Sequence, residues 1–535
     1  MYYITRREHG ALDITSPITL WKEYDVTTLP LNTSALSKKT ENDICVKEFY
    51  FDGYTTVDGR VRAFVKIAEN PQAKGVILFL KDMNAGVSDE IGTVMYELGY
   101  TIATLDYLGK NDDRAHYTLY PRSLDDCNSY GVDRFDVAAD EKYSRWYIWT
   151  CIARRAHLFL KQQYEALPIF ALGVGLGGST VYKLSAFDDG PTACATLLNI
   201  IPNVVGDGNA IINYHASLDN YAYASISKLP LFMAIATNDA DGSLDDMSDL
   251  ADNTQSLKHF RILERAFAPG ISAVCPDLDK FFTNSVKNTE YFSRPQIEAV
   301  NSDGSLYLNI NTTCEKKAEN SKLKLFLSFC VDDVPFRNWM EIPSIGLGDG
   351  KFMAQINVCR DDKPLYAFAN LISESGDIQS TPMITVMPKS LNIHARGGVA
   401  HRKIYDGSMG KDCWTSRIGG KISLIQGPYG IDGVTSDKNS LLTFKPGDPL
   451  FKVPADTILQ IMASGKPQTL NVKVCDKTNI YTCKVEITME EAWHKFSLSH
   501  ENFKSATGTL TDWSQIVTLE FESDEQFIIG SALWV

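Results

Sequence analysis

The first half of the chain alternates short apolar runs with segments of helical periodicity. The runs GVILFL (75–80), TIATLD (101–106) and PIFALG (168–173) are typical of strands buried on both faces. Between them, apolar residues recur at helical spacing, most clearly over residues 142–165. Strands separated by helices predict crossover connections, and therefore a mostly parallel sheet covered on both faces. Further runs of this kind lie at 195–201, 230–236 and 260–268.

The segment after the first run carries start and stop signals for a helix. Ser88 offers an N-cap, and Asp89 and Glu90 would fall in the favourable first turn. Gly99 would end the helix as a C′ glycine. A closing helix is predicted around residues 278–286.

Two other regions differ from this pattern. Residues 46–67 form two alternating runs around a polar turn, which predicts an antiparallel hairpin at the sheet edge. After about residue 290, short alternating runs recur between turn signals and helical periodicity all but disappears. We therefore expect a multidomain chain in which two β-sandwiches, one Ig-like and one a jelly roll, follow the α/β region. The predicted parts are an N-terminal extension (1–45), the α/β domain (46–290), a small antiparallel sandwich (291–390) and a jelly-roll-like sandwich (391–535).

Charge and composition narrow the choice of partners. Lys and Arg number 52 against 66 Asp and Glu, a net charge of −14, and no stretch is dense in basic residues. Duplex binding needs a basic surface that replaces phosphate counterions, so we expect neither nucleic acid nor an anionic membrane as partner. Residues 1–20 lack the apolar core of a signal peptide, and no run is long enough to span a bilayer. These features predict a cytoplasmic protein.

The cysteine pattern also agrees with a cytoplasmic protein. There are 11, an odd number without any CxxC pair, and several sit in apolar strand-like runs. Buried free thiols are therefore favoured over a disulfide framework. Cys475 and Cys483 flank a predicted turn and could pair in an oxidising compartment.

The segment PIFALGVGLGGSTVYKL (168–184) is where catalytic chemistry is expected. A buried strand runs into a Gly-rich turn and then a helix, the context in which G-x-S-x-G lifts a serine above a sheet. Here the apex is Gly175, which has no nucleophile, and the nearest hydroxyl, Ser179, lies four residues later. The same letters satisfy G-x-G-x-x-G and raise a dinucleotide-binding interpretation. Against it, no acidic residue ends the next strand, which reads ATLLNIIPN.

Residues 46–290 resemble an α/β-hydrolase domain of the acetyl-xylan-esterase or dienelactone-hydrolase type. The similar features are the edge hairpin, GVILFLKDMNAG, TIATLDYLGK, the glycine-rich elbow and PLFMAIATNDADGS. Such enzymes use a Ser–acid–His triad in that chain order, with backbone donors forming the oxyanion hole. The resemblance implies carboxylic-ester hydrolysis without a cofactor or a metal ion.

When the family's catalytic residues are mapped onto this sequence one by one, the catalytic triad is incomplete. The nucleophile position maps to Gly175, and the acid maps to Asp239, or to Asp241 in a shifted register. The oxyanion donors would be the N–H of Leu176 and a backbone group of the turn after the first strand, near Asp82 to Asn84 and centred on Met83. In this mapping the acid alone keeps a suitable side chain.

The catalytic histidine is also missing from its expected place. It should follow the last strand, within AFAPGISAVCP (266–276), but no histidine occurs between His259 and His394. His259 precedes the predicted strand, at the wrong end of the sheet. Cys275 lies in this segment, yet no histidine near it in sequence would activate the thiol, so we expect it to be inert. Without nucleophile and base, the domain is expected to have lost catalysis.

The C-terminal block resembles carbohydrate-binding jelly-roll modules. The stretch AWHKFSLSHENFKSATGTLTDWSQIVTLEF, followed by FIIGSALWV, is similar to their last strands. Its tryptophans fall on alternating patterns and are expected in the core, whereas Trp414 sits in the polar stretch KDCWTSR and is the ligand-binding candidate.

Three functions remain open. The chain is a non-catalytic hydrolase fold that binds a ligand such as a glycan or a small acyl ester, a working ester hydrolase with unrecognised catalytic residues, or a purely structural interaction protein.

Overall fold

The computed structural model describes residues 15–535 apart from 58, 83–84, 111–113, 125–140, 203, 205, 207, 290–292, 313–320 and 398–400. Contacts between residues divide the chain into two compact units. The first comprises Met1–Ile235, Asp241–Phe260 and Ser272–Tyr291, and the second comprises Ala236–Ala240, Arg261–Ile271 and Phe292–Val535.

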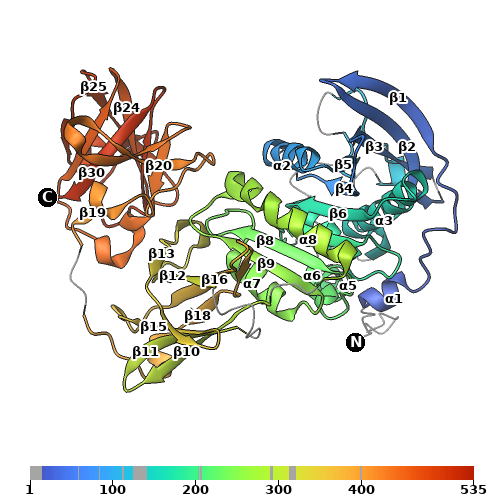
Figure 1. Ribbon diagram of the computed structural model, residues 1–535, viewed down its shortest axis with the longest axis horizontal. Coiled ribbons are helices and arrows are strands. Elements are labelled where there is room, and N and C mark those ends of the chain that lie inside the picture. The colour runs from blue at the N-terminus through green and yellow to red at the C-terminus, as the bar shows by residue number, and fades with distance from the viewer. Residues whose placement is uncertain are drawn as a thin grey trace. The chain divides into compact units, whose positions relative to one another are not determined.

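The α/β region is built on one large sheet (Figure 1), whose described strands follow the order β1-β2-β3-β5-β4-β6-β7-β8-β9. The first three strands form antiparallel pairs, and β5, β4, β6, β7 and β8 pair in parallel. The mostly parallel sheet and the antiparallel hairpin are thus confirmed, but β1 lies outside the hairpin and forms the sheet edge. The strands are β1 (Ser34–Glu41), β2 (Ile44–Thr56), β3 (Gly59–Glu69), β4 (Val76–Leu80), β5 (Thr101–Asp106), β6 (Ile169–Val174), β7 (Ala193–Leu197), β8 (Leu231–Ala236) and β9 (Leu257–Leu263).

Helices cover this sheet because its central strands are apolar on both faces. Every residue of β4, β6 and β7 is buried, as expected for parallel strands between helical layers. Helix α4 packs on β6 and β7, and α3 packs on β2. The helices are α1 (Pro17–Trp21), α2 (Ala85–Glu97), α3 (Arg145–Gln163), α4 (Leu176–Leu184), α5 (Gly208–Ser217), α6 (Asn220–Ala224), α7 (Leu244–Asn253) and α8 (Cys275–Lys287).

Three local predictions need correction. Helix α2 begins at Ala85, so Ser88 lies inside it and is not its N-cap. There the Ser88 hydroxyl accepts a hydrogen bond from the backbone of Asp82 at 3.1 Å, a tertiary contact that sequence spacing does not reveal. Strand β9 begins three residues before the predicted run and includes His259. Strand β1 falls in the predicted N-terminal extension, where no strand was predicted; its residues are mostly exposed at the sheet edge and lack an apolar pattern.

The following region is an antiparallel sandwich of two sheets, as predicted. One sheet has the order β10-β11-β15-β14, and the other has the order β13-β12-β16-β17 with β18 added beside β16. Leucine, isoleucine and alanine side chains from both sheets share one core. The strands are β10 (Gln296–Ser302), β11 (Ser305–Asn311), β12 (Lys322–Phe329), β13 (Met340–Ile342), β14 (Ile345–Gly348), β15 (Lys351–Ile356), β16 (Leu365–Ile372), β17 (Ile378–Ser380) and β18 (Ile384–Val386).

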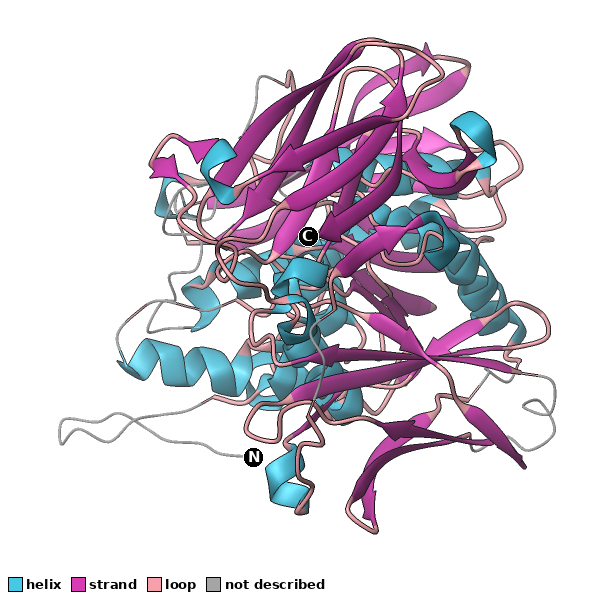
Figure 2. Cartoon of the chain, turned by 90° about the vertical axis from the view of Figure 1, so that its left-hand side faces the viewer, coloured by secondary structure: helices cyan, strands magenta, loops and turns pink. Residues whose placement is uncertain are grey.

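The C-terminal region is a second sandwich, which Figure 2 shows as strands around the C-terminus with only short helical turns. Its sheets have the orders β20-β21-β30-β23-β26, with β19 beside β30, and β22-β29-β24-β25-β27-β28. The strands are β19 (Lys403–Asp406), β20 (Ile422–Gln426), β21 (Asp432–Ser436), β22 (Ser440–Thr443), β23 (Leu459–Gly465), β24 (Gln468–Cys475), β25 (Ile480–Ile487), β26 (His494–Leu498), β27 (Lys504–Ser505), β28 (Gly508–Thr509), β29 (Thr518–Glu522) and β30 (Phe527–Trp534).

The register of β24 and β25 bears on the predicted cysteine pair. Cys475 lies opposite Ile480, and Cys483 lies opposite Val472, so the two cysteines are three residues out of register. Three residues along a strand span about 10 Å, whereas a disulfide needs Cα atoms less than about 7 Å apart. This pairing is therefore incompatible with the observed sheet.

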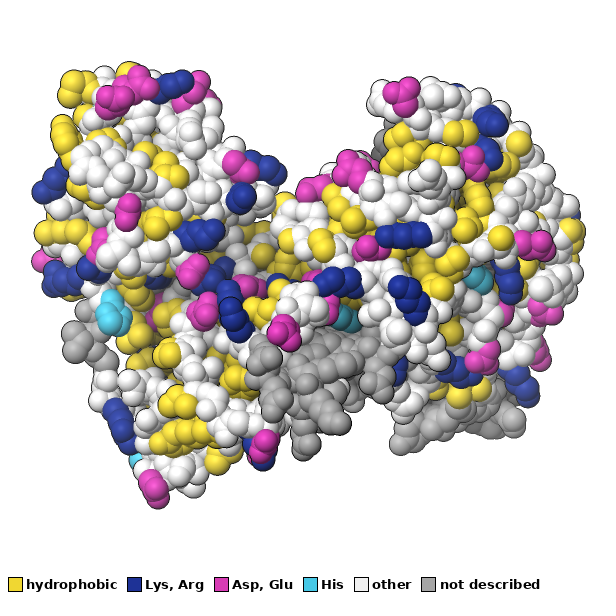
Figure 3. Space-filling view, viewed as in Figure 1, with side chains coloured by type: hydrophobic (Ala, Val, Ile, Leu, Met, Phe, Trp, Pro, Cys, Tyr) yellow, Lys and Arg dark blue, Asp and Glu magenta, His cyan; other side chains and the backbone are white. Residues whose placement is uncertain are grey.

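The visible surface mixes both signs of charge. On the face shown in Figure 3, Lys and Arg side chains are interspersed with Asp and Glu side chains. Among the described residues, no helix is both long and apolar enough to cross a membrane.

Candidate functional site: a blocked nucleophile elbow

The turn between β6 and α4 has the sharp geometry of a nucleophile elbow. Gly175 has φ +56° and ψ −119° and stands directly before the first residue of α4. Its backbone N–H donates to the carbonyl of Leu197 at 3.0 Å, which ties the turn to β7. A positive φ is unfavourable for residues with a Cβ atom, so this conformation is strained for a serine and free of strain for glycine.

The flanking glycines are needed because backbone approaches backbone. A Cβ atom on Gly173 would lie 2.3 Å from the carbonyl oxygen of Gly177. A Cβ atom on Gly177 would lie 2.2 Å from the carbonyl oxygen of Leu80, at the end of β4. The glycine pattern is therefore explained by packing of the strand–turn–helix unit itself.

The Asp82 side chain occupies the place where a nucleophile would stand. A Cβ atom on Gly175 would lie 2.3 Å from both Cγ and Oδ1 of Asp82, far inside contact distance. The Leu176 N–H, predicted as an oxyanion donor, donates instead to Oδ1 of Asp82 at 3.2 Å. The other predicted donor, Met83, lies outside the described residues. Sequence reasoning placed Asp82 in the oxyanion turn but missed this role of its carboxylate.

Neighbouring groups favour Asp82 in this position. Its backbone N–H donates to the Ser88 hydroxyl, and the adjacent Lys81 forms an ion pair with Asp89. The carboxylate stands at the N-terminus of α4, where the helix dipole favours negative charge. The same carboxylate occupies the position in which a dinucleotide would place its phosphates, which disfavours that interpretation of the glycine pattern.

Ser179 does not replace the missing nucleophile. It lies within α4, is only 1% exposed, and its hydroxyl hydrogen-bonds to Oδ1 of Asn199 at 2.7 Å. The buried Lys183 amine donates to the Ser179 backbone carbonyl at 3.1 Å and to Asn220 Oδ1 at 2.8 Å. Burial lowers the pKa of Lys183 to about 7, but the amine is bonded to the Ser179 backbone and not to its hydroxyl. This cluster is a buried, hydrogen-bonded polar core beneath the elbow and leaves the Ser179 hydroxyl bonded to Asn199.

The two candidate acids differ in exposure. Asp239, in the turn after β8, is 5% exposed, whereas Asp241 is exposed. A solvated strand-end loop therefore describes Asp241 and not Asp239. Asp241 is part of the first compact unit with Gly175, and Asp239 is part of the second.

His259 and Cys275, the base and thiol candidates of the sequence analysis, are both buried. His259 is a buried residue of β9, and its ring stacks on Phe232 of β8 with centroids 4.6 Å apart. Cys275 is the first residue of α8, a position that favours a thiolate. Burial nevertheless raises its pKa to about 12, so the thiol stays protonated at neutral pH.

The strand order and the elbow together identify the architecture. This region has the α/β-hydrolase fold. No protein-family model matches the chain, and a search of well-characterised sequences finds no match.

Three solved structures illustrate the likeness. Dienelactone hydrolase from Anabaena variabilis ATCC 29413 is 14% identical, with 44% of this chain and 97% of that chain covered and a TM-score of 0.30. Acetyl xylan esterase from Paenibacillus sp. R4 is 15% identical, with 49% of this chain and 90% of that chain covered and a TM-score of 0.35. Acetyl xylan esterase 1 from Thermoanaerobacterium sp. JW/SL YS485 is 13% identical, with 48% of this chain and 89% of that chain covered and a TM-score of 0.37.

A cavity of about 720 Å³ adjoins the blocked elbow of the hydrolase domain. We call it the elbow cavity. Phe64, Phe79 and Ile102 supply apolar walls, while Asp82 and His116 stand among its polar lining groups. Its size is within the range of small-molecule sites. No group of metal-binding side chains suited to an ion occurs among the described residues.

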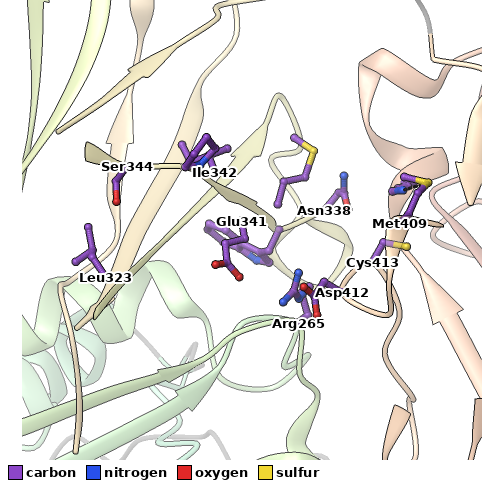
Figure 4. Close-up of a pocket in the computed structure, with 13 residues that line it drawn as sticks. Arg265, Leu323, Asn338, Glu341, Ile342, Ser344, Met409, Asp412 and Cys413 are labelled. Carbon is purple, nitrogen blue, oxygen red and sulfur yellow. Dashed lines mark hydrogen bonds between the residues drawn. The ribbon is translucent and has the colours of Figure 1, made fainter. Parts of the chain in front are cut away.

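A second cavity, of about 600 Å³, lies within the second unit (Figure 4). Arg265, Glu341 and Asp412 give its lining both signs of charge. Lys445 also lines it, and burial lowers the pKa of this amine, which hydrogen-bonds to the thiol of Cys413.

Trp414, the predicted ligand residue, does not line this second cavity. It is 4% exposed and packs in the core of the C-terminal sandwich, with ring centroids 5.3 Å from Tyr405 and 5.7 Å from Phe521. The prediction that it presents its ring to a ligand is not supported. The polar sequence around it misled because Lys411 and Asp412 are exposed, while Thr415 and Ser416 are buried beside it and its own ring completes the core.

Proposed function

We propose that this chain is an α/β-hydrolase-fold protein that has lost catalysis at its elbow and acts as a ligand- or carbohydrate-binding scaffold. One observation carries the proposal: the Asp82 carboxylate takes both the space of a nucleophile on residue 175 and the N–H of Leu176. The absence of histidine from residues 260–393 supports it independently.

The chemistry of ester hydrolysis explains why the Asp82 carboxylate at this position is unfavourable for catalysis. The tetrahedral intermediate carries a negative charge that backbone N–H groups must stabilise, and one such donor is worth about 10²–10³ in rate. A carboxylate bonded to that donor competes for it and repels the developing oxyanion. With glycine at the apex there is also no covalent nucleophile, so two separate contributions to the rate are absent.

The elbow cavity is the proposed binding site. A small glycan suits it because sugar hydroxyls can donate to the Asp82 carboxylate while apolar walls accept the sugar's carbon face. An acyl ester is the alternative ligand, bound without turnover. Nucleic acid and membranes are not proposed as partners, given the net charge of −14. The cytoplasmic location stays a prediction from the sequence.

Hydrolysis assays test the loss of catalysis. The purified full chain is incubated with p-nitrophenyl acetate and with acetylated xylan, and release of product is compared with the spontaneous rate. We expect no excess turnover. A rate above background that one substitution abolishes, such as Ser179→Ala, would overturn the proposal and establish the alternative, an active ester hydrolase.

Binding assays separate the ligand-binding role from a purely structural one. The full chain is tested on a glycan array, and each hit is measured by calorimetry with Asp82→Ala. The matched control is Asp188→Asn, which changes an exposed carboxylate of the same domain that pairs with Lys228. Binding lost in Asp82→Ala and kept in the control supports the elbow cavity. Absence of binding to any glycan or acyl ester favours a structural interaction protein.

A further inference from the structure

Two cysteines follow strands that belong to different sheets of the middle sandwich. Cys330 directly follows β12, and Cys359 comes three residues after the end of β15. Strands β12 and β15 belong to the two opposing sheets. Both cysteines pack against the core that these sheets share. A covalent bond between them would therefore join one sheet to the other.

Direct contacts bring the two thiols together. The Cys330 side chain hydrogen-bonds to the Cys359 side chain. The backbone N–H of Cys330 also donates to the Pro364 carbonyl at 2.9 Å, so the loop that begins at Cys359 returns to the end of β12. Both cysteines are partly exposed, which leaves them within reach of a small reagent.

We propose that Cys330 and Cys359 are a redox pair that closes to an inter-sheet disulfide when the protein meets a low-molecular-weight disulfide such as oxidised glutathione. The Cys359 thiolate attacks one sulfur of the glutathione disulfide and releases one reduced glutathione. The Cys330 thiolate then attacks the Cys359 sulfur of the mixed disulfide and releases the second. Two protein thiols are oxidised, one glutathione disulfide is reduced to two thiols, and their hydrogens balance.

The electrostatics of the pair agree with this order of attack. The hydrogen bond from Cys330 lowers the pKa of Cys359, while the same bond and burial raise the pKa of Cys330. Cys359 is then the more ionised thiol, and the thiolate is the attacking species. By contrast, burial raises the pKa of the fully buried Cys151 and Cys194. Those thiols are expected to stay reduced.

The decisive experiment uses the wild-type full chain. The protein is incubated with oxidised glutathione, free thiols are capped with N-ethylmaleimide, and peptides are mapped by mass spectrometry without reduction. We expect a linked pair of peptides containing Cys330 and Cys359, with the loss of two hydrogen atoms. Capped Cys330 and Cys359 with a disulfide elsewhere, or glutathione left stably on Cys359, would overturn the proposal.

Single variants provide the second measurement. In Cys330→Ser, the mixed disulfide at Cys359 cannot be resolved, so a stable glutathione adduct on Cys359 is expected. Cys475→Ser is the matched control, since Ile480 and not a cysteine lies opposite Cys475, and this variant should form the Cys330–Cys359 disulfide like wild type. Oxidised wild type should also unfold several degrees above the reduced protein, because the cross-link constrains the unfolded chain. Equal midpoints would show that no constraint joins the sheets.

Discussion

The Asp82 carboxylate accepts a hydrogen bond from the Leu176 backbone N–H and fills the space beside Gly175. In an α/β-hydrolase, that N–H follows the nucleophile and belongs to the oxyanion hole. The elbow conformation of the chain is thus retained, while the groups around it are arranged for a resident carboxylate. This coupling between residues 82 and 175 can be measured.

Gly175→Ala should destabilise the protein for two reasons. The added Cβ atom would overlap the Asp82 carboxylate, and the alanine would have to keep the positive φ of residue 175. We expect a loss of about 2–4 kcal/mol in the free energy of unfolding, measured by urea denaturation. In an Asp82→Ala background the steric part disappears, so the cost of the same substitution should fall by about 1–2 kcal/mol.

Gly86→Ala is the matched control for this cycle. Gly86 lies in α2, and no atom stands within 4 Å of an added Cβ atom. Alanine should leave stability unchanged or raise it by up to about 1 kcal/mol. If Gly175→Ala costs as much with Asp82 as without it, the carboxylate does not fill the nucleophile position.

Trp414→Ala tests whether Trp414 belongs to the core of the C-terminal sandwich and not to a ligand site. Because its ring is buried between Tyr405 and Phe521, truncation should lower the stability of the C-terminal sandwich by about 3–5 kcal/mol. Thermal unfolding followed by tryptophan fluorescence measures the effect. A variant that keeps its unfolding midpoint but loses glycan binding would restore Trp414 as a ligand residue.

The sequence predicted the fold better than the site. Buried parallel strands such as β4 and β6 are continuous apolar runs, so their periodicity alone identifies them. The edge strand β1 was missed because seven of its eight residues are polar or small and most of its side chains face solvent. Apolar patterning reports burial, and an exposed edge has little of it.

The blocked elbow could not be predicted from the sequence because it depends on contacts between distant segments. Gly175 at the apex was visible in the sequence, but the Asp82 carboxylate lies 94 residues away from its hydrogen-bond donor, Leu176. Spacing cannot show which rotamer a side chain adopts. The one available signal was that Asp82 follows β4, since the carboxyl ends of neighbouring parallel strands meet at one sheet edge.

Asp52 should make the hydrolase domain sensitive to acid. Burial opposes ionisation of its carboxyl, but hydrogen bonds from Asn32, Arg62 and Arg60 outweigh burial and lower its pKa. A lowered folded-state pKa stabilises the fold above the unfolded pKa of about 3.9, and this contribution is lost as pH falls through the folded value. Asp52→Asn should destabilise the protein at neutral pH, with a difference from wild type that shrinks below about pH 4.

Urea denaturation at several pH values measures that difference. The control Asp188→Asn removes an exposed carboxylate and should change stability by less than about 0.5 kcal/mol throughout. A wild-type advantage over Asp52→Asn that stays constant down to about pH 2 would show that ionisation of Asp52 does not stabilise the fold.

Lys183 should make the stability of the fold rise with pH in alkaline solution. Burial lowers its pKa to about 7 in the folded protein, against about 10.4 in an unfolded chain. Between these values the unfolded state binds more protons, so this group makes the folded state more stable as pH rises from about 7 to 10. Below about pH 7 both states are charged and the contribution is constant. Lys183→Met removes the titrating amine, and the stability of wild type relative to this variant should therefore increase from about pH 7 to 10 in urea denaturation. Comparison with the variant cancels the buried cysteines and tyrosines that titrate in the same range. A difference independent of pH would show that the amine beneath the elbow keeps its ordinary pKa.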